Sequence, residues 1–304
     1  MKIVVTGGTG LLGKSLRDIR ENYIYLSSSD VNLMDRIRTR CILSDLTPTT
    51  IIHLAGKVGG IRDNIENPYQ FILQNNQINT NIIDWCVKSN VRLIFASSTC
   101  VYPKNSTQYP MTENMVDCGE PESTNDAYAY AKRFANQMLR AANKQYGFEY
   151  CTLYFCNLYG EHDDFLNKTK SHLVTALIQK FHNAKEHNED KVVLFGTGNP
   201  MRQFIHSDDA ANIIKIVLDK NISGEYNVAI PDNLTINAIA QIAKEIVGFK
   251  GNIEFNGTLD GVYRKDVCSQ KLLNTIGKYE FISLRLGIEK TYNAFLRKTR
   301  LCGS

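Results

Sequence analysis

Hydrophobic and polar positions alternate along the first half of the chain in blocks that predict strands and helices in turn. Short apolar runs at residues 3–5, 23–26, 50–55 and 92–96 are typical of buried strands. Residues 68–88 instead carry apolar side chains at the three- and four-residue spacing of an amphipathic helix. Strands that alternate with helices predict a parallel sheet with helices on both faces. We therefore expect an α/β fold with a Rossmann-type, doubly wound parallel sheet.

The pattern changes character after residue 156. A polar, aromatic loop at 157–165 is followed by shorter strand and helix patterns, and an amphipathic helix is expected at 284–298. We expect a dinucleotide-binding domain over residues 1–156, to which a later segment at about 205–230 returns. Residues 157–304 should form mainly a smaller α/β portion that binds the substrate.

Composition narrows the class of protein. At 304 residues and 43% hydrophobic, the chain can bury a substantial core. A net charge of +4 without long Lys/Arg runs argues against a nucleic-acid partner and favours a small anionic ligand. No apolar run approaches a membrane span or an export signal, so a cytoplasmic protein is expected. The eight cysteines include no C-x-x-C pair, so neither a zinc site nor a redox site is predicted.

The first apolar run leads directly into a glycine-rich segment, TGGTGLLG at residues 6–13, and then into a predicted helix. Its three glycines have the spacing G-x-x-G-x-x-G, a variant of the dinucleotide-binding fingerprint. Glycines permit the tight turn, and the amino terminus of the helix then faces the pyrophosphate. The residues of this loop expected to contact the cofactor are Gly7, Thr9, Gly10, Leu11, Leu12 and Gly13.

The second strand ends in Ser27 and Ser28, where an enzyme selective for the unphosphorylated cofactor would carry an acid. Small serines leave room for a 2′-phosphate and can donate hydrogen bonds to it, although no arginine clamp is evident. We assign Asp30 to the loop on the adenine side. NADPH/NADP is therefore favoured over NADH. The other residues expected near the cofactor are Asn32, Leu33, Leu54 and Ala55.

Tyr128 and Lys132 stand four residues apart in a predicted helix and so lie on one face of it. An ammonium beside a phenol favours the phenolate, so we expect Lys132 to lower the pKa of Tyr128 from its usual value of about 10. Ser98 and Cys100 emerge just past the strand at 92–96. Ligands of doubly wound sheets bind outside the carboxyl ends of the strands, which favours these side chains as active-site groups.

Six segments carry a resemblance to a known family: 53–61 (HLAGKVGGI), 95–103 (FASSTCVYP), 125–132 (NDAYAYAK), 157–165 (NLYGEHDDF), 171–182 (SHLVTALIQKFH) and 195–209 (FGTGNPMRQFIHSDD). With the glycine segment they resemble the extended short-chain dehydrogenase/reductase family. Within it they are most similar to the GDP-L-fucose synthases, which are 3,5-epimerases and 4-reductases of a GDP-4-keto-6-deoxy sugar. The resemblance covers roughly the first 210 residues in the right order.

The resemblance implies roles for five residues. Tyr128 would give a proton to the keto oxygen during hydride transfer, Lys132 would activate it and bind the ribose, and Ser98 would hydrogen-bond to the same oxygen. Cys100 and His172 would be the base and acid of epimerisation, because a ketone acidifies the protons on both flanking carbons. A free thiol has a pKa of about 8.5, so Cys100 needs a cationic neighbour to act as a thiolate.

The resemblance also implies a GDP-linked 4-keto sugar as substrate and a homodimer joined by a four-helix bundle, built from helices near 69–88 and 127–146. Lys180 and Arg202 would lie on the diphosphate side. Lys180, Phe195 and Glu161 replace the arginine, tryptophan and proline that many family members carry, which leaves the sugar open. The residues expected to bind substrate are Lys57, Val58, Gly59, Asn157, Lys180, Phe195 and Arg202.

Two alternatives stay open at the level of sequence. One is a 4-reductase without epimerase activity, which acts on a GDP-4-keto-6-deoxy-heptose destined for a surface polysaccharide, such as a capsule. The other is an NADP-binding sensor protein without catalysis, in which Ser98, Tyr128 or Lys132 would be expected to be replaced. All three residues are intact.

Overall fold

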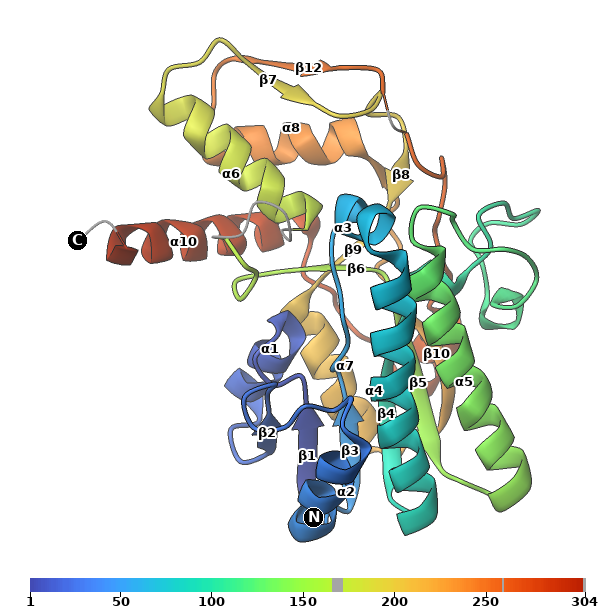
Figure 1. Cartoon of the computed structure of the whole chain (residues 1–304). Helices are drawn as coiled ribbons and strands as arrows, with labels where there is room; N and C mark the ends of the chain where they lie inside the picture. The colour runs from blue at the N-terminus through green and yellow to red at the C-terminus, as the bar shows by residue number, and fades with distance from the viewer. Residues whose placement is uncertain (166–171, 259, 303–304) are drawn as a thin grey trace.

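A computed structural model describes residues 1–165, 172–258 and 260–302 of the chain (Figure 1). Its centre is a six-stranded sheet in the order β10-β5-β4-β3-β1-β2, in which every pair of neighbours is parallel. The strands are β1 (Ile3–Thr6), β2 (Ile24–Leu26), β3 (Thr50–His53), β4 (Arg92–Ser98), β5 (Tyr150–Phe155) and β10 (Gly224–Val228). The predicted fold class, a doubly wound parallel sheet, is confirmed.

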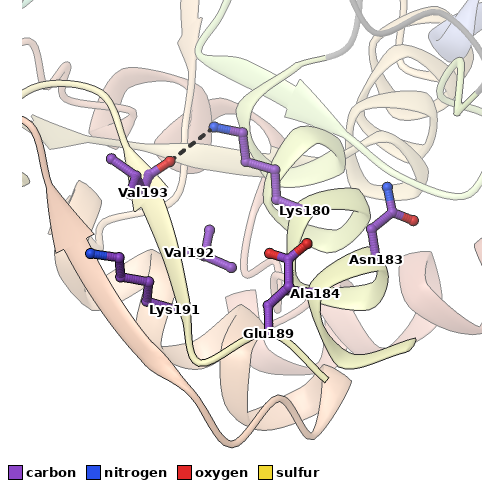
Figure 2. Close-up of a pocket in the computed structure, with 7 residues that line it drawn as sticks. All are labelled: Lys180, Asn183, Ala184, Glu189, Lys191, Val192 and Val193. Atoms are coloured by element: carbon purple, nitrogen blue, oxygen red, sulfur yellow. Dashed lines mark hydrogen bonds between the residues drawn. The ribbon is translucent and has the colours of Figure 1, made fainter. Parts of the chain in front are cut away.

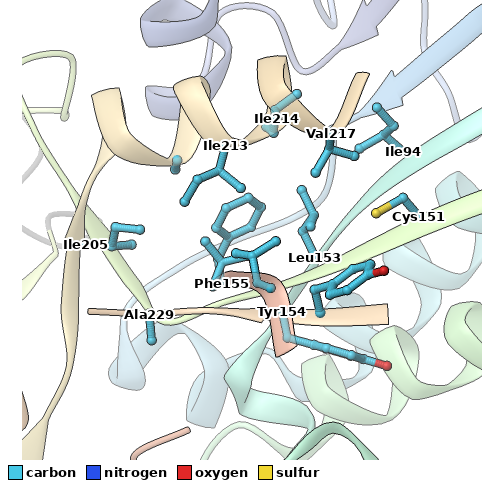
Figure 3. Packing of buried hydrophobic residues seen from close by; sticks show 14 of the residues in the cluster. Ile94, Cys151, Leu153, Tyr154, Phe155, Ile205, Ile213, Ile214, Val217 and Ala229 are labelled. Atoms are coloured by element: carbon cyan, nitrogen blue, oxygen red, sulfur yellow. The ribbon is translucent and has the colours of Figure 1, made fainter. Parts of the chain in front are cut away.

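Helices cover both faces of the sheet, because successive side chains of a strand point to opposite faces. Val5 packs in a core with α1 (Leu11–Ile19) and α7 (Ser207–Asp219), and Figure 3 shows Ile213, Ile214 and Val217 of α7 over β4 and β5. The other face packs against α2 (Arg36–Leu46), α4 (Pro68–Ser89) and α5 (Asp126–Tyr146). The helix predicted at 68–88 is thereby confirmed as α4.

β10 comes from late in the chain and is tied to the sheet by a polar cluster at its edge. Glu225 accepts two hydrogen bonds from Arg140 of α5, both at 2.7 Å, and one each from Tyr150 and Tyr154 of β5. Hydrogen bonds that involve a charged group are stronger than neutral ones. The cluster therefore fixes residues of the first and later parts of the chain against each other.

The rest of the chain forms a smaller α/β portion with its own core, which lies above the carboxyl ends of the sheet strands in Figure 1. Its strands pair two by two: β6 (Asn157–Tyr159) with β9 (Phe204–His206), β7 (Lys191–Leu194) with β12 (Asn252–Phe255), and β8 (Met201–Arg202) with β11 (Leu234–Thr235). Its larger helices are α6 (Leu173–Glu186), α8 (Ile236–Val247) and α10 (Leu284–Cys302). The shorter helices of the chain are α3 (Ile61–Glu66), η1 (Thr99–Val101), η2 (Glu113–Met115) and α9 (Gln270–Ile276).

Two further observations concern helices. Ser171, where the sequence segment 171–182 begins, lies outside the described residues, and the helix of that segment starts at Leu173. Among the helices that the structure describes, none has the length and apolar character needed to cross a membrane.

Candidate active site

The glycine loop between β1 and α1 has a conformation that requires glycine at two positions. Gly7 has φ of 75°, and a Cβ there would lie 2.8 Å from the backbone nitrogen of Ala55. A Cβ at Gly13 would lie 2.3 Å from the carbonyl oxygen of Gly7. Thr9 and Gly10 are exposed, and Gly10 is the N-cap of α1, so the positive end of that helix is open to an anionic ligand. The loop fits a dinucleotide pyrophosphate.

The side chains of Leu12 and Leu33 point into the core, so only their backbones can contact a cofactor. Leu11 is partly buried and Asn32 is exposed, while Leu54 and Ala55 line the back of the glycine turn.

The ribose end of the predicted cofactor site holds an acid that the sequence analysis assigned to the adenine-side loop. Asp30 Oδ2 accepts hydrogen bonds from the backbone nitrogen of Ser27 at 2.7 Å and from its Oγ at 2.6 Å. These bonds lower the pKa of Asp30, and the charge of Arg17 adds to the effect. Ser28 is exposed beside them. The guanidinium of Arg17 lies over the ring of Tyr25 of β2, with Cζ 4.6 Å from the ring centre. This cation near Asp30 was not predicted, because Arg17 belongs to α1 and is distant in sequence from the end of β2.

Tyr128 and Lys132 lie on one face of α5, as their spacing predicts. Lys132 Nζ is 5.8 Å from the centre of the Tyr128 ring, lies over the ring of Phe95 at 4.5 Å and donates a hydrogen bond to the carbonyl oxygen of Ala96 at 2.8 Å. The side chain is held inside the protein, since Lys132 is only 3% exposed. The ammonium therefore has a fixed place below the phenol.

Burial changes the protonation of both groups. It lowers the pKa of Lys132 to about 7. It also raises the pKa of Tyr128, and the nearby thiol of Cys100 adds to the increase. The expected lowering of the Tyr128 pKa is therefore wrong for this structure, because burial removes the hydration that would stabilise the phenolate. Tyr128 is held as a neutral phenol, the form that can donate a proton.

Ser98 and Cys100 stand at the carboxyl end of β4, next to α5. Ser98 Oγ accepts a hydrogen bond from the backbone nitrogen of Cys100 at 3.2 Å. Asn125, the N-cap residue of α5, donates from Nδ2 to Cys100 Sγ at 3.2 Å. Asn125 was not predicted as a site residue, although it opens the same sequence segment as Tyr128.

Arg202 supplies a cation near Cys100. Its Nη1 donates to the carbonyl oxygens of Met201 at 2.8 Å and of Val262 at 2.7 Å. Burial lowers the pKa of Arg202, and the negative charges of Cys100 and Glu122 partly offset that decrease. The structure thus brings Ser98, Cys100, Tyr128, Lys132 and Arg202 together.

His172 is the N-cap residue of α6, in the smaller portion of the chain. Its Nδ1 lies 3.1 Å from Asp163 Oδ1 and 3.2 Å from Asp163 Oδ2. Burial lowers the pKa of His172, but the hydrogen bond and charge of Asp163 outweigh burial and raise it overall. Sequence reasoning missed Asp163, which stands nine residues earlier, within the segment 157–165 that carries the resemblance.

The other residues expected to bind substrate lie in the loop after β3, on β6 and in the smaller portion of the chain. Asn157 donates to the carbonyl oxygen of Gln203 at 2.8 Å. Lys57 is held through its backbone by Asn75 at 2.9 and 3.0 Å. Val58 is exposed, and the carbonyl oxygen of Gly59 accepts from Asn64 at 3.1 Å.

Lys180 and Phe195 form a pair at the edge of the smaller portion. Lys180 Nζ lies over the Phe195 ring at 5.1 Å and donates to the carbonyl oxygen of Val193 at 3.3 Å. Figure 2 shows Lys180 beside an open cavity of about 420 Å³ between α6 and β7. Its lining contains none of Ser98, Tyr128 and Lys132, so we do not place the reaction there. Phe195 is 67% exposed and offers a flat apolar face to a ligand.

Comparison with known proteins assigns the chain to a family. Residues 3–229 match the NAD dependent epimerase/dehydratase family. The chain belongs to this family. The resemblance noted in the sequence is confirmed by relatives that match nearly the whole chain.

One such relative in the epimerase/dehydratase family is the GDP-L-fucose synthase of Dictyostelium discoideum, 33% identical over 97% of this chain and 95% of the relative. Among solved structures, a GDP-L-fucose synthetase from Naegleria fowleri bound to NADP is 31% identical, with a TM-score of 0.87 over 98% of this chain and 93% of that chain. A GDP-6-OMe-4-keto-L-xylo-heptose reductase from C. jejuni is 25% identical, with a TM-score of 0.91 over 98% of both chains.

Proposed function

We propose that the chain is an NADPH-dependent reductase of a GDP-4-keto-6-deoxy sugar, and that it also epimerises the carbons that flank the ketone. The observation that carries the proposal is a cluster of four side chains at the carboxyl end of β4, namely Ser98, Cys100, Tyr128 and Lys132. The same sheet carries a glycine loop that fits a dinucleotide. The relatives and solved structures with GDP-sugar names support the substrate class.

In the reduction, the glycine loop between β1 and α1 would hold the dinucleotide, which would supply a hydride for the keto carbon. Tyr128, which is a protonated phenol at neutral pH, supplies the proton to the oxygen as charge develops there. Ser98 Oγ donates a second hydrogen bond to that oxygen. Lys132, with a pKa of about 7, stabilises the phenolate that remains.

In the epimerisation, the Cys100 thiolate removes a proton from a carbon next to the ketone. Ser98 and Tyr128 stabilise the enolate oxygen, and His172 returns a proton on the opposite face of the sugar. The amide of Asn125 donates to Cys100 Sγ at 3.2 Å, and Arg202 interacts electrostatically with the same residue, so both groups lie beside the sulfur that would act as the base.

We assign residues 1–156, with the returning segment at about 205–230, to cofactor binding and residues 157–304 mainly to substrate binding. The substrate's diphosphate would bind between the cations of Arg202 and Lys180, and Phe195 and Asn157 would lie near the sugar nucleotide. Lys57, Val58 and Gly59 would border the sugar from the loop after β3.

The direct test is NADPH oxidation by the purified chain with GDP-4-keto-6-deoxymannose and with its heptose counterpart. We expect one NADPH to be consumed for each keto sugar reduced. Without NADPH, we expect deuterium from D₂O to enter the carbons flanking the ketone. Reduction without deuterium uptake would favour the 4-reductase alternative on a heptose, which the likeness to the C. jejuni reductase supports. Failure to oxidise NADPH with either sugar would refute the reductase assignment.

We further propose a homodimer through α4 and α5. These helices expose Tyr69, Leu73, Tyr130 and Phe134 on the surface away from the sheet, which favours pairing with the same face of a second copy in a four-helix bundle. Light scattering should give twice the chain's 34.4 kDa, and Phe134→Glu should give one chain at the same concentration. Ile37→Glu, on exposed α2, is the matched control and should stay dimeric. A wild-type mass of one chain would contradict the dimer.

A further inference from the structure

We propose that Asp163 is the positioning residue for His172, and that its carboxylate fixes the imidazole through Nδ1 so that Nε2 transfers the proton during epimerisation. The inference rests on the proposed epimerase function and extends it to a residue that takes no part in the reaction itself. Three structural features support it: the geometry of the pair, the rigid support of the carboxylate, and the charge that the carboxylate places beside the ring.

The geometry of the pair suits a donor nitrogen and a charged acceptor. Both oxygens of Asp163 lie within hydrogen-bond distance of Nδ1, at 3.1 and 3.2 Å. A carboxylate accepts and does not donate, so Nδ1 must carry the hydrogen. In the neutral ring this leaves Nε2 as the unprotonated nitrogen. Among the described residues, none forms a hydrogen bond with Nε2, and the His172 side chain is 44% exposed.

The carboxylate of Asp163 is held in place by hydrogen bonds from groups other than His172. Asp163 has only 5% of its side chain exposed, on the loop that follows β6. Thr175 Oγ1, from the first turn of α6, donates a short hydrogen bond to Oδ2, and the backbone nitrogen of Asp164 donates to Oδ1 at 3.0 Å. Thr175 is fully buried. A buried carboxylate must be paired to remain charged, and this one is paired on both oxygens.

The charge of Asp163 determines which protonation state His172 favours. Burial lowers the pKa of the imidazole, but the hydrogen bond and negative charge of Asp163 together raise it above the usual value. The proton-donating form is therefore fully present at low pH and is lost as pH rises through this raised pKa. Among the described residues, the charged groups near the pair include Asp164, next to Asp163 in the chain, and Lys298 of α10, which interacts electrostatically with Asp163, Asp164 and Glu161. Removal of the Asp163 charge should move the loss of the donor form to lower pH.

The test combines a titration of His172 with a measurement of proton exchange. Asp163→Asn keeps an oxygen that can accept from Nδ1 but removes the charge. In ¹⁵N spectra of the six histidines, with His172 identified by His172→Gln, the variant should titrate His172 at lower pH than wild type does. Deuterium uptake into the keto sugar near neutral pH should fall roughly tenfold to a hundredfold, as expected for loss of a charged hydrogen bond. Its pH profile should shift in the same direction.

Two further variants distinguish positioning from general damage. Thr175→Val keeps the carboxylate but removes one of its supports, so its uptake should lie between those of wild type and Asp163→Asn. Asp18→Asn removes the carboxylate that contacts His162 at 2.6 Å on the surface and should leave uptake unchanged. NADPH oxidation with a sugar that already has the inverted centres should remain near wild type in all three variants.

The outcomes separate this inference from the function on which it rests. Wild-type uptake together with an unshifted His172 titration in Asp163→Asn would overturn the role of Asp163. Absence of uptake in the wild-type protein would overturn the epimerase proposal itself, whatever the variant does.

Discussion

Tyr128→Phe should lower the rate of NADPH-dependent reduction by about 10²- to 10⁴-fold, which is the usual contribution of a positioned general acid to the rate. Phenylalanine keeps the ring but removes the hydroxyl whose proton would go to the keto oxygen. Burial raises the pKa of Tyr128, so the phenol is protonated at neutral pH and holds that proton beside the reacting oxygen. The measurement is NADPH oxidation at saturating keto sugar, followed at 340 nm.

The matched control is Tyr130→Phe, which removes a hydroxyl two residues further along α5 from a ring that is exposed at the surface. It should reduce the sugar at the wild-type rate. NADPH binding, measured by fluorescence, should be the same in both variants, because neither hydroxyl contacts the glycine loop. A Tyr128→Phe rate within tenfold of wild type would remove Tyr128 from the role of proton donor.

Cys100→Ser should nearly abolish deuterium uptake at the flanking carbons, by about 10²-fold or more, while reduction of a sugar with the inverted centres continues. A serine hydroxyl is far less acidic than a thiol, so the amide of Asn125 and the charge of Arg202 cannot ionise it near neutral pH. Uptake is measured by NMR or mass spectrometry in D₂O without NADPH.

Cys118→Ser provides the comparison, because Cys118 is an exposed free cysteine outside the site. It should change neither uptake nor reduction. If Cys100→Ser takes up deuterium as fast as the wild-type protein, another group must be the base. If instead it loses both activities together, the two reactions do not divide between Cys100 and Tyr128 as proposed.

Local sequence predicted the parts of the site that depend on local geometry. The turn at Gly7 and Gly13 follows from strand, glycine and helix in immediate succession, and Tyr128 meets Lys132 because they are four residues apart on a helix. The alternation of apolar runs likewise predicted the parallel sheet. In each case the residues that interact are neighbours in sequence or occupy a repeating pattern.

Sequence alone did not reveal the features that depend on how distant segments pack. The pKa of Tyr128 is raised and not lowered because its main cause is burial, which the local sequence does not indicate. Asp163 and His172 come from a loop and a helix end that meet only in the folded chain. Asp30 lies in the loop after β2, as expected, but composition does not predict that its carboxylate accepts hydrogen bonds from the backbone and hydroxyl of Ser27.

The position of β10 affects how the protein is made. One of the sheet's two outer strands is β10, residues 224–228, and its Glu225 accepts hydrogen bonds from Arg140 in the polar cluster. In a nascent chain that has left the ribosome only as far as residue 156, β5 is therefore an exposed edge of the sheet. Tyr150 and Tyr154 on this strand then lack Glu225, the carboxylate to which their hydroxyls donate in the folded protein. Such edges invite pairing with other chains. Because β10 is made about seventy residues after β5, the six-stranded sheet can be completed only after most of the chain has been synthesised.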